Sequence, residues 1–226
     1  MKKSLSLIFL LAVAISATAQ QKVLVAYFSF TNNTKAYAEK IATMTGGDLY
    51  EIVPQVAYGD ENNKYYDEST RAYQEQRNTG GEQRPEIFAT LTNAEQYNII
   101  FLGSPIWYGK SPRVILTFLD TYGFAGKTVV PFVTSASTGI SQVNEELPSA
   151  YPCIHWIEGK RLNGMSDSDL QTWVQGIMQT TTALQDVSAE TPTAKGVYTL
   201  SGLPLSSADN LPAGVYLING QKQIIK

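Results

Sequence analysis

The chain has 226 residues, of which 43% are hydrophobic and 16% are charged, and its formal net charge is −3 with an isoelectric point near 5.2. This length fits one globular domain of ordinary size with appendages. The mild negative charge and the lack of any lysine or arginine cluster exclude a basic surface for nucleic acid, so we expect no nucleic-acid partner.

Residues 1–19 have the pattern of a signal peptide. Lys2-Lys3 precede an apolar run over residues 5–15, and Ala17-Thr18-Ala19 forms a small-x-small cleavage site. A membrane anchor is the alternative, but the run is too short to span a bilayer, and no later segment qualifies. We therefore expect an exported protein of the periplasm, the cell surface or the medium, without a membrane span.

The apolar run at residues 23–28 predicts a buried strand, which the loop Ser29-Phe30-Thr31-Asn32-Asn33-Thr34 connects to a helix over about 33–45. Gly46-Gly47 is expected to end that helix. A hydroxyl-rich loop at a helix start presents N–H groups and hydroxyls where the helix dipole favours an anion. The sequence therefore predicts a phosphate site here, with a plain helix N-cap as the alternative. The spacings of an ATP-binding P-loop and of a dinucleotide-binding fold do not occur.

Residues 49–53 alternate as a second strand, and two strands joined by a helix predict a right-handed βαβ unit with a parallel sheet. Residues 55–87 form a long, polar, tyrosine-rich connection, in which we expect one helix near residues 65–76. Connections of this length are often functional, and an amphipathic crossover helix lying on the sheet is the alternative. Thr92 and Glu95 have the spacing of a capping box, which predicts a short helix before the next strand.

Residues 98–103 form a nearly continuous apolar run, typical of a central strand buried on both faces. The loop after it, Pro105-Ile106-Trp107-Tyr108-Gly109, carries two aromatic residues where a doubly wound sheet opens its crevice. Such rings can stack on a flat ligand, and the alternative is a loop folded onto hydrophobic surface. Ser111 and Pro112 are expected to be the N-cap and first residue of a helix that Gly123 ends.

Residues 128–133 predict another buried strand, which ends in the small, hydroxyl-bearing loop Thr134-Ser135-Ala136-Ser137-Thr138-Gly139. Its small side chains would let backbone groups approach a heterocycle closely, although solvated turns have the same composition. Residues 153–157 predict the fifth strand, and Ser166 is expected to cap a final helix. His155 lies within that strand, so we expect it to serve the core or the sheet face. With one histidine and one cysteine, neither a catalytic triad nor the usual zinc site is predicted, and no catalytic residue is assigned.

Three strand ends thus carry loops suited to a ligand, and in this order they resemble the flavodoxin-like FMN-binding proteins over roughly residues 22–185. The resemblance implies an α/β fold with a doubly wound, five-stranded parallel sheet in three α/β/α layers, and FMN as the cofactor. The first loop resembles the flavodoxin phosphate loop, S/T-x-T-G-x-T, and departs from it at Asn32, where glycine is usual. Asparagine tolerates a positive φ better than most residues.

The resemblance assigns cofactor-binding residues loop by loop. The FMN phosphate is expected at Ser29, Thr31, Asn32, Asn33 and Thr34. The isoalloxazine ring is expected beside Pro105, Ile106, Trp107, Tyr108 and Gly109, and its opposite edge beside Thr134, Ser135, Ser137 and Gly139.

The end of the chain has a different character. We expect the flavodoxin-like domain at residues 20–185, a linker at 186–196 and short β-strands at 197–226, which would form a small C-terminal β appendage. This tail resembles the C-terminal sorting domains of type IX secretion cargo in Gram-negative bacteria. A hairpin added to the edge of the parallel sheet is the alternative.

The resemblance implies an exported FMN protein that transfers electrons to or from a redox partner protein or a small-molecule acceptor. Electron-carrier flavodoxins are generally more acidic than this chain, so a flavin-dependent reductase of quinones or other small acceptors is an alternative. A third possibility, from a different class, is a surface or periplasmic binding module that keeps the fold and has lost the flavin.

Overall fold

The computed structural model describes residues 21–60, 67–78, 83–188, 196–199, 204–205, 207, 211–218 and 221–225. The predicted signal peptide at 1–19 and most of the predicted linker lie outside the described residues. Within those ranges, no helix combines the length and the apolar character needed to cross a membrane.

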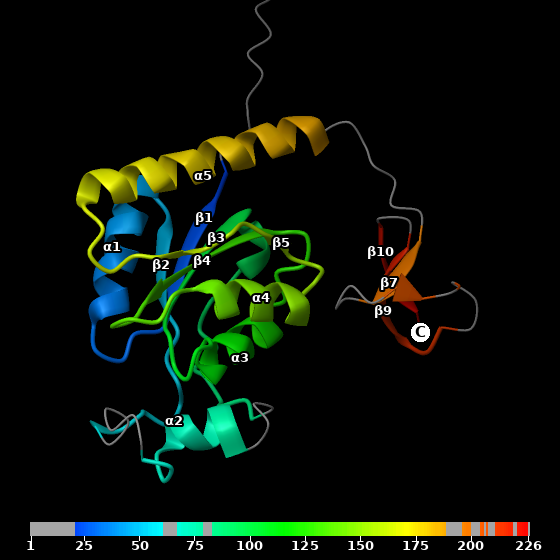
Figure 1. The fold of residues 1–226 in the computed structure, drawn as a ribbon. Helices are drawn as coiled ribbons and strands as arrows, with labels where there is room; N and C mark the ends of the chain where they lie inside the picture. Colours follow the sequence, from blue (N-terminus) through cyan, green and yellow to red (C-terminus); the bar gives the residue numbers. More distant parts are fainter. Residues whose placement is uncertain are drawn as a thin grey trace, which may run out of the picture.

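A parallel β-sheet forms the centre of the fold, with the strand order β2-β1-β3-β4-β5 (Figure 1). The strands are β1 Val23–Tyr27, β2 Asp48–Glu51, β3 Ile99–Pro105, β4 Thr128–Thr134 and β5 His155–Trp156. Neighbouring strands pair in parallel, for example Val25 with Leu49 and with Phe101. The predicted parallel sheet is confirmed, and β3 is its central strand, as the apolar run at 98–103 predicted.

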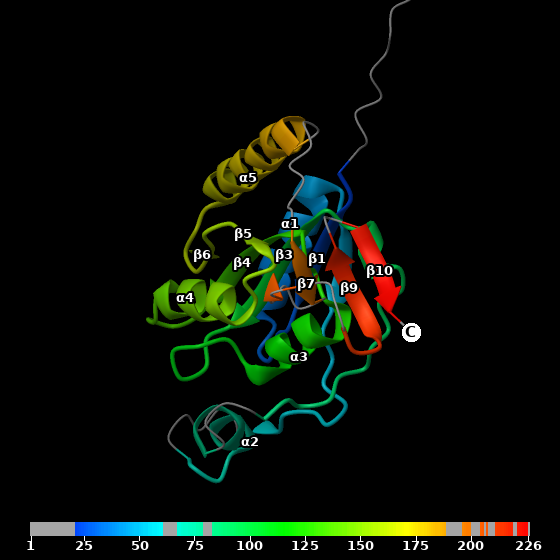
Figure 2. The ribbon, with the colours of Figure 1, turned by 90° about the vertical axis from the view of Figure 1, so that its right-hand side faces the viewer.

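Helices cover both faces of this sheet. They are α1 Asn33–Thr45, α3 Arg113–Tyr122, α4 Ser141–Ala150 and α5 Asp167–Ser188. In Figure 2, α1 and α5 lie on one side of the sheet and α3 and α4 on the other. The fold is therefore the predicted three-layer, doubly wound α/β arrangement.

Two hydrophobic cores follow from the alternation of side chains along each strand. Val23, Val25 and Phe101 pack on one face with apolar residues of α1 and α5. Leu24 and Ile100 pack on the opposite face with α3 and α4. Because every strand of the sheet centre contributes to both cores, its residues read as unbroken apolar runs in the sequence.

The fifth strand is shorter than predicted because Pro131 interrupts its ladder. On the side of β4 that faces β5, the carbonyls of Val129 and Val133 accept hydrogen bonds. Backbone groups two residues apart in a strand point to the same side, so the backbone of Pro131 also faces β5. A proline has no N–H to donate there. Pairing resumes only at β6, Lys160–Arg161, so the edge consists of two separate two-residue strands. His155, expected to serve the core or the sheet face, is exposed on β5.

Two predicted helix starts are wrong. The residue that caps α3 is Pro112 and not Ser111, whose hydroxyl is buried without a partner among the described residues. The short helix before β3 is the 3-10 helix η3, Ala94–Gln96, and its N-cap is Asn93 with φ 54°, so Thr92 and Glu95 form no capping box. Asparagine replaces the predicted threonine cap because it tolerates this left-handed conformation.

The long connection contains α2, Arg71–Tyr73, which continues as a π-helix, η2, over Gln74–Asn78. The helix predicted near 65–76 therefore starts later, at the Thr70 cap, and ends later; residues 61–66, with Tyr65 and Tyr66, lie outside the described residues. The Thr70 hydroxyl accepts a hydrogen bond from the N–H of Tyr73. In both Figures 1 and 2, α2 lies below α3 at one end of the fold, and it does not lie on the sheet as a crossover helix would.

The C-terminal strands form an antiparallel sheet of their own, in the order β10-β9-β7-β8. They are β7 Val197–Thr199, β8 Pro204–Leu205, β9 Gly214–Ile218 and β10 Gln221–Ile225. In the described ranges these strands pair only with one another. A separate small β appendage, and not a hairpin on the edge of the parallel sheet, ends the chain.

Gly103 of β3 supplies a test of the core packing. A Cβ at this position would collide with the fully buried Phe132 ring on β4. We expect Gly103→Ala to lower the free energy of unfolding by about 1–3 kcal/mol, since overpacking forces the ring out of its site. Gly139→Ala is the matched control, because nothing lies within 4 Å of a Cβ there. Equal urea-unfolding midpoints for the two variants would contradict this account of the core.

Candidate functional site

The three predicted loops meet at the carboxyl ends of the strands, because β1, β3 and β4 are adjacent and parallel. The hydroxyls of Thr34 and Thr134 lie 2.8 Å apart and link the first loop to the third, and both residues are buried, with 1% and 3% exposed. The backbone N–H of Ile106 donates to the carbonyl of Thr134 at 3.1 Å, which links the second loop to the third. Residues far apart in the sequence thus form one continuous surface.

The first loop leaves backbone donors available at the start of α1. Asn32 is the N-cap, with φ 61°, and its side chain makes no capping hydrogen bond. The Ser29 hydroxyl accepts from the N–H of Lys35 at 3.2 Å. In the described part of the chain, nothing accepts a hydrogen bond from the N–H of Asn33 or Thr34. Free N–H groups at a helix start form a ready site for an anion such as phosphate.

The side chains of the first loop are less available than its backbone. Thr31, Asn32 and Asn33 are exposed, and the Asn33 amide donates to the Thr31 hydroxyl at 3.1 Å. The Thr34 hydroxyl is directed at Thr134, so the N–H is the group that Thr34 can offer a ligand. Of the predicted donors, backbone N–H groups and hydroxyls, the N–H groups of Asn33 and Thr34 are therefore the more available.

The second loop is a tight turn at Tyr108-Gly109. Trp107 and Lys110 exchange two backbone hydrogen bonds of 2.9 and 3.1 Å, and Tyr108 and Gly109 have φ values of 51° and 86°. Positive φ at both central residues is the geometry of a type I′ turn. The φ of 86° is what favours glycine at position 109, because a Cβ there would meet only the flexible end of the Gln142 side chain of α4. Pro105 is the last residue of β3, and Ile106 is buried.

The two aromatic residues of this loop lie in different environments. Trp107 is 8% exposed and packs edge-on against Phe28, Phe30 and Tyr58, with ring centroids 5.5, 6.0 and 4.8 Å away. Tyr108 is only half-buried; its ring lies 5.6 Å from that of Tyr73. Trp107 thus covers hydrophobic surface, as in the alternative reading of the loop. Tyr108 is half-buried, and the Arg77 guanidinium lies over its ring, 5.8 Å from the centroid.

The third loop is held by two residues that the sequence analysis did not identify. Arg161 of β6 donates through its Nε and Nη2 atoms to the Ser135 carbonyl, at 3.1 and 2.7 Å, and through Nη2 to the Ala136 carbonyl at 3.0 Å. The Asn163 side chain accepts from the N–H of Ser135 at 2.7 Å. Ser137 and Gly139 are exposed beyond this clamp. No local spacing marks Arg161 or Asn163, because only the pairing of β6 with β4 brings them to the loop.

The connection between β2 and β3 packs against the second loop. Tyr58, beside Trp107, donates its hydroxyl to the buried Glu75 at 2.6 Å. Burial, together with the negative charge of Glu75, raises the pKa of Tyr58 well above its usual value, so the hydroxyl remains a donor. The side-chain amide of Gln76 donates to the Ser111 carbonyl at 2.9 Å. The tyrosine-rich connection is therefore part of the wall of this site.

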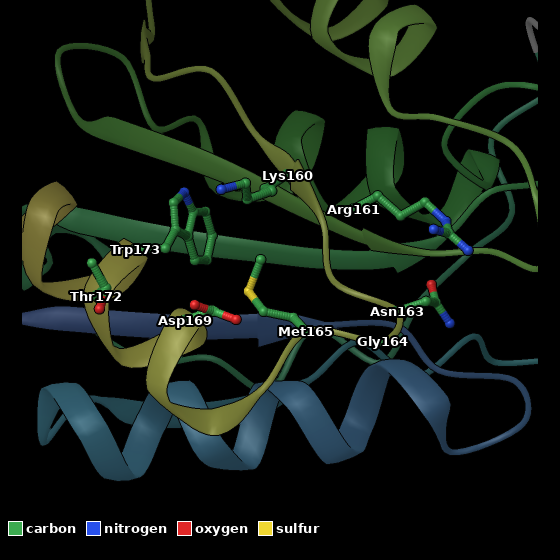
Figure 3. A pocket seen from close by; sticks show the side chains of 8 residues that line it. All are labelled: Lys160, Arg161, Asn163, Gly164, Met165, Asp169, Thr172 and Trp173. Carbon is green, nitrogen blue, oxygen red and sulfur yellow. The ribbon is translucent and has the colours of Figure 1, made fainter.

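A cavity of about 450 Å³ lies beside the third loop. Eight residues line it: Lys160, Arg161, Asn163, Gly164, Met165, Asp169, Thr172 and Trp173. Figure 3 shows Lys160 and Met165 near Trp173, whereas Arg161 and Asn163 extend away from that group. A second cavity, of about 170 Å³, lies between Phe28, Ser29 and Phe30 of the first loop and the chain that follows β2. In the described ranges, no group of three His, Cys, Asp or Glu residues is placed to hold a metal ion.

Comparisons with known proteins agree on the kind of fold that this site belongs to. A family model described as flavodoxin matches residues 22–177. A crystal structure of a candidate flavoprotein from Bacteroides uniformis ATCC 8492 is 38% identical and has a TM-score of 0.65; the match covers 69% of this chain and 98% of that one. A candidate flavoprotein from Bacteroides eggerthii DSM 20697 is 36% identical, with coverage of 70% and 98% and a TM-score of 0.65.

A flavoprotein from Lactobacillus acidophilus NCFM, solved in complex with FMN, is 27% identical, with coverage of 68% and 98% and a TM-score of 0.55. A search of curated proteins finds no match.

Proposed function

Since the chain belongs to the flavodoxin family, we propose that it is a flavoprotein that holds FMN without a covalent bond and transfers electrons. The observation that carries this proposal is the free pair of N–H groups, Asn33 and Thr34, at the start of α1, in a loop joined to the third loop through Thr134. The FMN complex of the Lactobacillus acidophilus flavoprotein supports the same cofactor.

The residues present fit FMN in two respects. The Asn33 and Thr34 N–H groups, at the positive end of the α1 dipole, suit the phosphate, and they would hold it without a cation. The half-buried Tyr108 ring, fixed by its type I′ turn, suits contact with a flat ring system. When bound, the flavin would supply the redox chemistry, accepting and giving electrons. The hydrogen bonds of Arg161 and Asn163 with Ser135 would keep the third loop in a fixed position against the flavin.

The charge of the protein favours a second candidate function. Removal of residues 1–19 takes away Lys2 and Lys3 and no acidic residue, which changes the formal charge from −3 to −5. This is a modest field for steering a protein partner at physiological salt. A reductase of quinones or other small acceptors, which needs no such steering, is therefore the second candidate.

A visible absorption spectrum tests the cofactor directly. The purified chain from residue 20 onward is expected to show flavin absorption as isolated or after addition of FMN and removal of the excess. A chain that folds but neither carries nor takes up FMN would overturn the proposal, and the binding-module function would replace it. Oxidation of the reduced protein by quinones, compared with oxidation by an acceptor protein, separates electron carriage from reductase activity.

We also propose that the protein is exported and that its C-terminal strands serve sorting and not flavin binding. The support is the signal-like sequence at 1–19 and the separate pairing of β7 to β10. Truncation after Ala194 is expected to leave the flavin spectrum and the unfolding midpoint unchanged and to alter the location of the protein in cell fractionation. Loss of folding on truncation would show that these strands stabilise the main domain.

A further inference from the structure

A buried carboxylate lies in the connection between β2 and β3, outside the parallel sheet. Glu75 is 1% exposed. Its Oε1 atom accepts from the Nε of Arg71 at 2.6 Å, and its Oε2 atom accepts from the Tyr58 hydroxyl at 2.6 Å. Burying a charged carboxylate is costly unless such partners satisfy it. Each of its oxygens therefore ties down a neighbouring side chain.

The same three residues are joined in a second way, which fixes the orientation of the tyrosine. The Arg71 guanidinium lies over the Tyr58 ring, 4.4 Å from its centroid, and Arg71 also donates to the Val56 carbonyl. The ring of Tyr58 is thus held by its hydroxyl at one end and by a cation over one face. Loss of the Glu75 charge would weaken both constraints together, because Arg71 and the Tyr58 hydroxyl both bond to that carboxylate.

This network contacts the second loop of the site through the tyrosine. The Tyr58 ring meets Trp107 edge-on at 4.8 Å, the shortest of the three ring contacts that Trp107 makes with Phe28, Phe30 and Tyr58. The residue after Glu75 reaches the chain just beyond the loop, since Gln76 donates to the Ser111 carbonyl at 2.9 Å. A chain segment outside the sheet therefore contacts the loop at Trp107 and the chain just after the loop at Ser111.

We propose that Glu75 is a positioning residue that, through Tyr58 and Arg71, holds Trp107 and the Tyr108 turn in the arrangement that sets the affinity and redox potential of the flavin. This inference rests on the proposed FMN function. The two oxygens of Glu75 bond to Arg71 and Tyr58, so Glu75 acts on the loop through these side chains. The connection thereby gains a role that its length and its tyrosines alone did not reveal.

The test compares Tyr58→Phe with Tyr97→Phe. Both changes delete one hydroxyl that donates to a carboxylate, since Tyr97 donates to Asp48 at 2.8 Å. Tyr97, which precedes β3, lies at the opposite end of the strands from the loops. We expect Tyr58→Phe to weaken FMN binding about fivefold or more and to shift the flavin absorption band and the midpoint potential, because a hydrogen bond to a charged group is lost. Tyr97→Phe should leave all three unchanged.

A second variant and a flavin-free measurement keep the outcome decisive. Glu75→Gln, which keeps the shape of the side chain and removes its charge, should shift the potential in the same direction as Tyr58→Phe. In the flavin-free protein, the indole N–H resonance of Trp107 can be identified among the three tryptophans by its loss in Trp107→Phe. The chemical shift of this resonance should change in Tyr58→Phe and stay the same in Tyr97→Phe.

The outcomes separate this inference from the proposed function. If the natural chain binds FMN but Tyr58→Phe behaves as Tyr97→Phe in affinity, spectrum and potential, the positioning role is wrong and the flavin function stands. If the natural chain binds no FMN, the proposed function fails and the role of Glu75 in setting a flavin potential fails with it. A moved Trp107 resonance would then assign the network to loop packing alone.

Discussion

FMN is expected to bind this protein at least about a hundredfold more tightly than riboflavin, because the phosphate would receive charge-assisted hydrogen bonds from two N–H groups. Those groups belong to Asn33 and Thr34, at the start of α1, where the helix dipole adds to the attraction. Titration of the flavin-free protein, followed by quenching of flavin fluorescence, measures both affinities. Equal affinities for the two flavins would remove the phosphate argument.

Asn32 offers a matched pair of variants for the same experiment. Its φ of 61° is open to glycine without cost, whereas alanine loses roughly 1 kcal/mol in this conformation. Asn32→Gly should therefore keep the preference for FMN over riboflavin. Asn32→Ala should weaken FMN binding by up to about tenfold and affect riboflavin much less. If Asn32→Gly weakened FMN binding more than Asn32→Ala, the loop would not need a left-handed residue at this position to form the site.

Trp107→Ala is expected to lower the free energy of unfolding by about 3–5 kcal/mol, the usual cost of truncating a buried large aromatic residue. Its ring is 8% exposed and contacts Phe28, Phe30 and Tyr58. Tyr108→Ala should cost much less, since that side chain is half-buried. Urea unfolding of the two flavin-free variants measures this difference.

The same two variants show which ring contacts the flavin. We expect Tyr108→Ala to weaken FMN binding and shift the midpoint potential of the flavin with little loss of stability. Trp107→Ala should change the affinity, the potential and the stability together. Potentiometry on the FMN-loaded proteins gives the shift. If affinity and potential are unchanged in both variants, the two rings only cover the core. Unchanged stability in Trp107→Ala would contradict the packing described above.

The parallel sheet and its central strand could be predicted because a strand buried on both faces has a nearly continuous apolar sequence. The runs that became β1, β3 and β4 are mostly apolar, and Gly46 ends α1 where it was expected to. The fifth strand could not be predicted in full, because the break depends on which side of β4 Pro131 faces. Helix α4 was not predicted; its buried apolar residues are only Val143 and Leu147, and Pro148 lies inside it.

For the candidate site, the loops could be predicted but their internal contacts could not. Loops after strands that are adjacent and parallel must lie together, so the positions of all three followed from the topology. The inward turn of Thr34 toward Thr134 depends on a partner 100 residues away. Arg161 and Glu75 reach the loops from β6 and from the connection, and neither has a sequence spacing that would reveal it.

The interrupted edge of the sheet bears on how the protein behaves at high concentration. An open edge strand presents a row of N–H and C=O groups that another molecule can extend into a larger sheet. Here the edge beside β4 offers β5 and β6, each two residues long, with the exposed Lys160 in the second. A strand from a neighbouring molecule would find no continuous ladder to join. By shortening the fifth strand, Pro131 therefore also makes edge-to-edge aggregation at the β5–β6 edge less favourable.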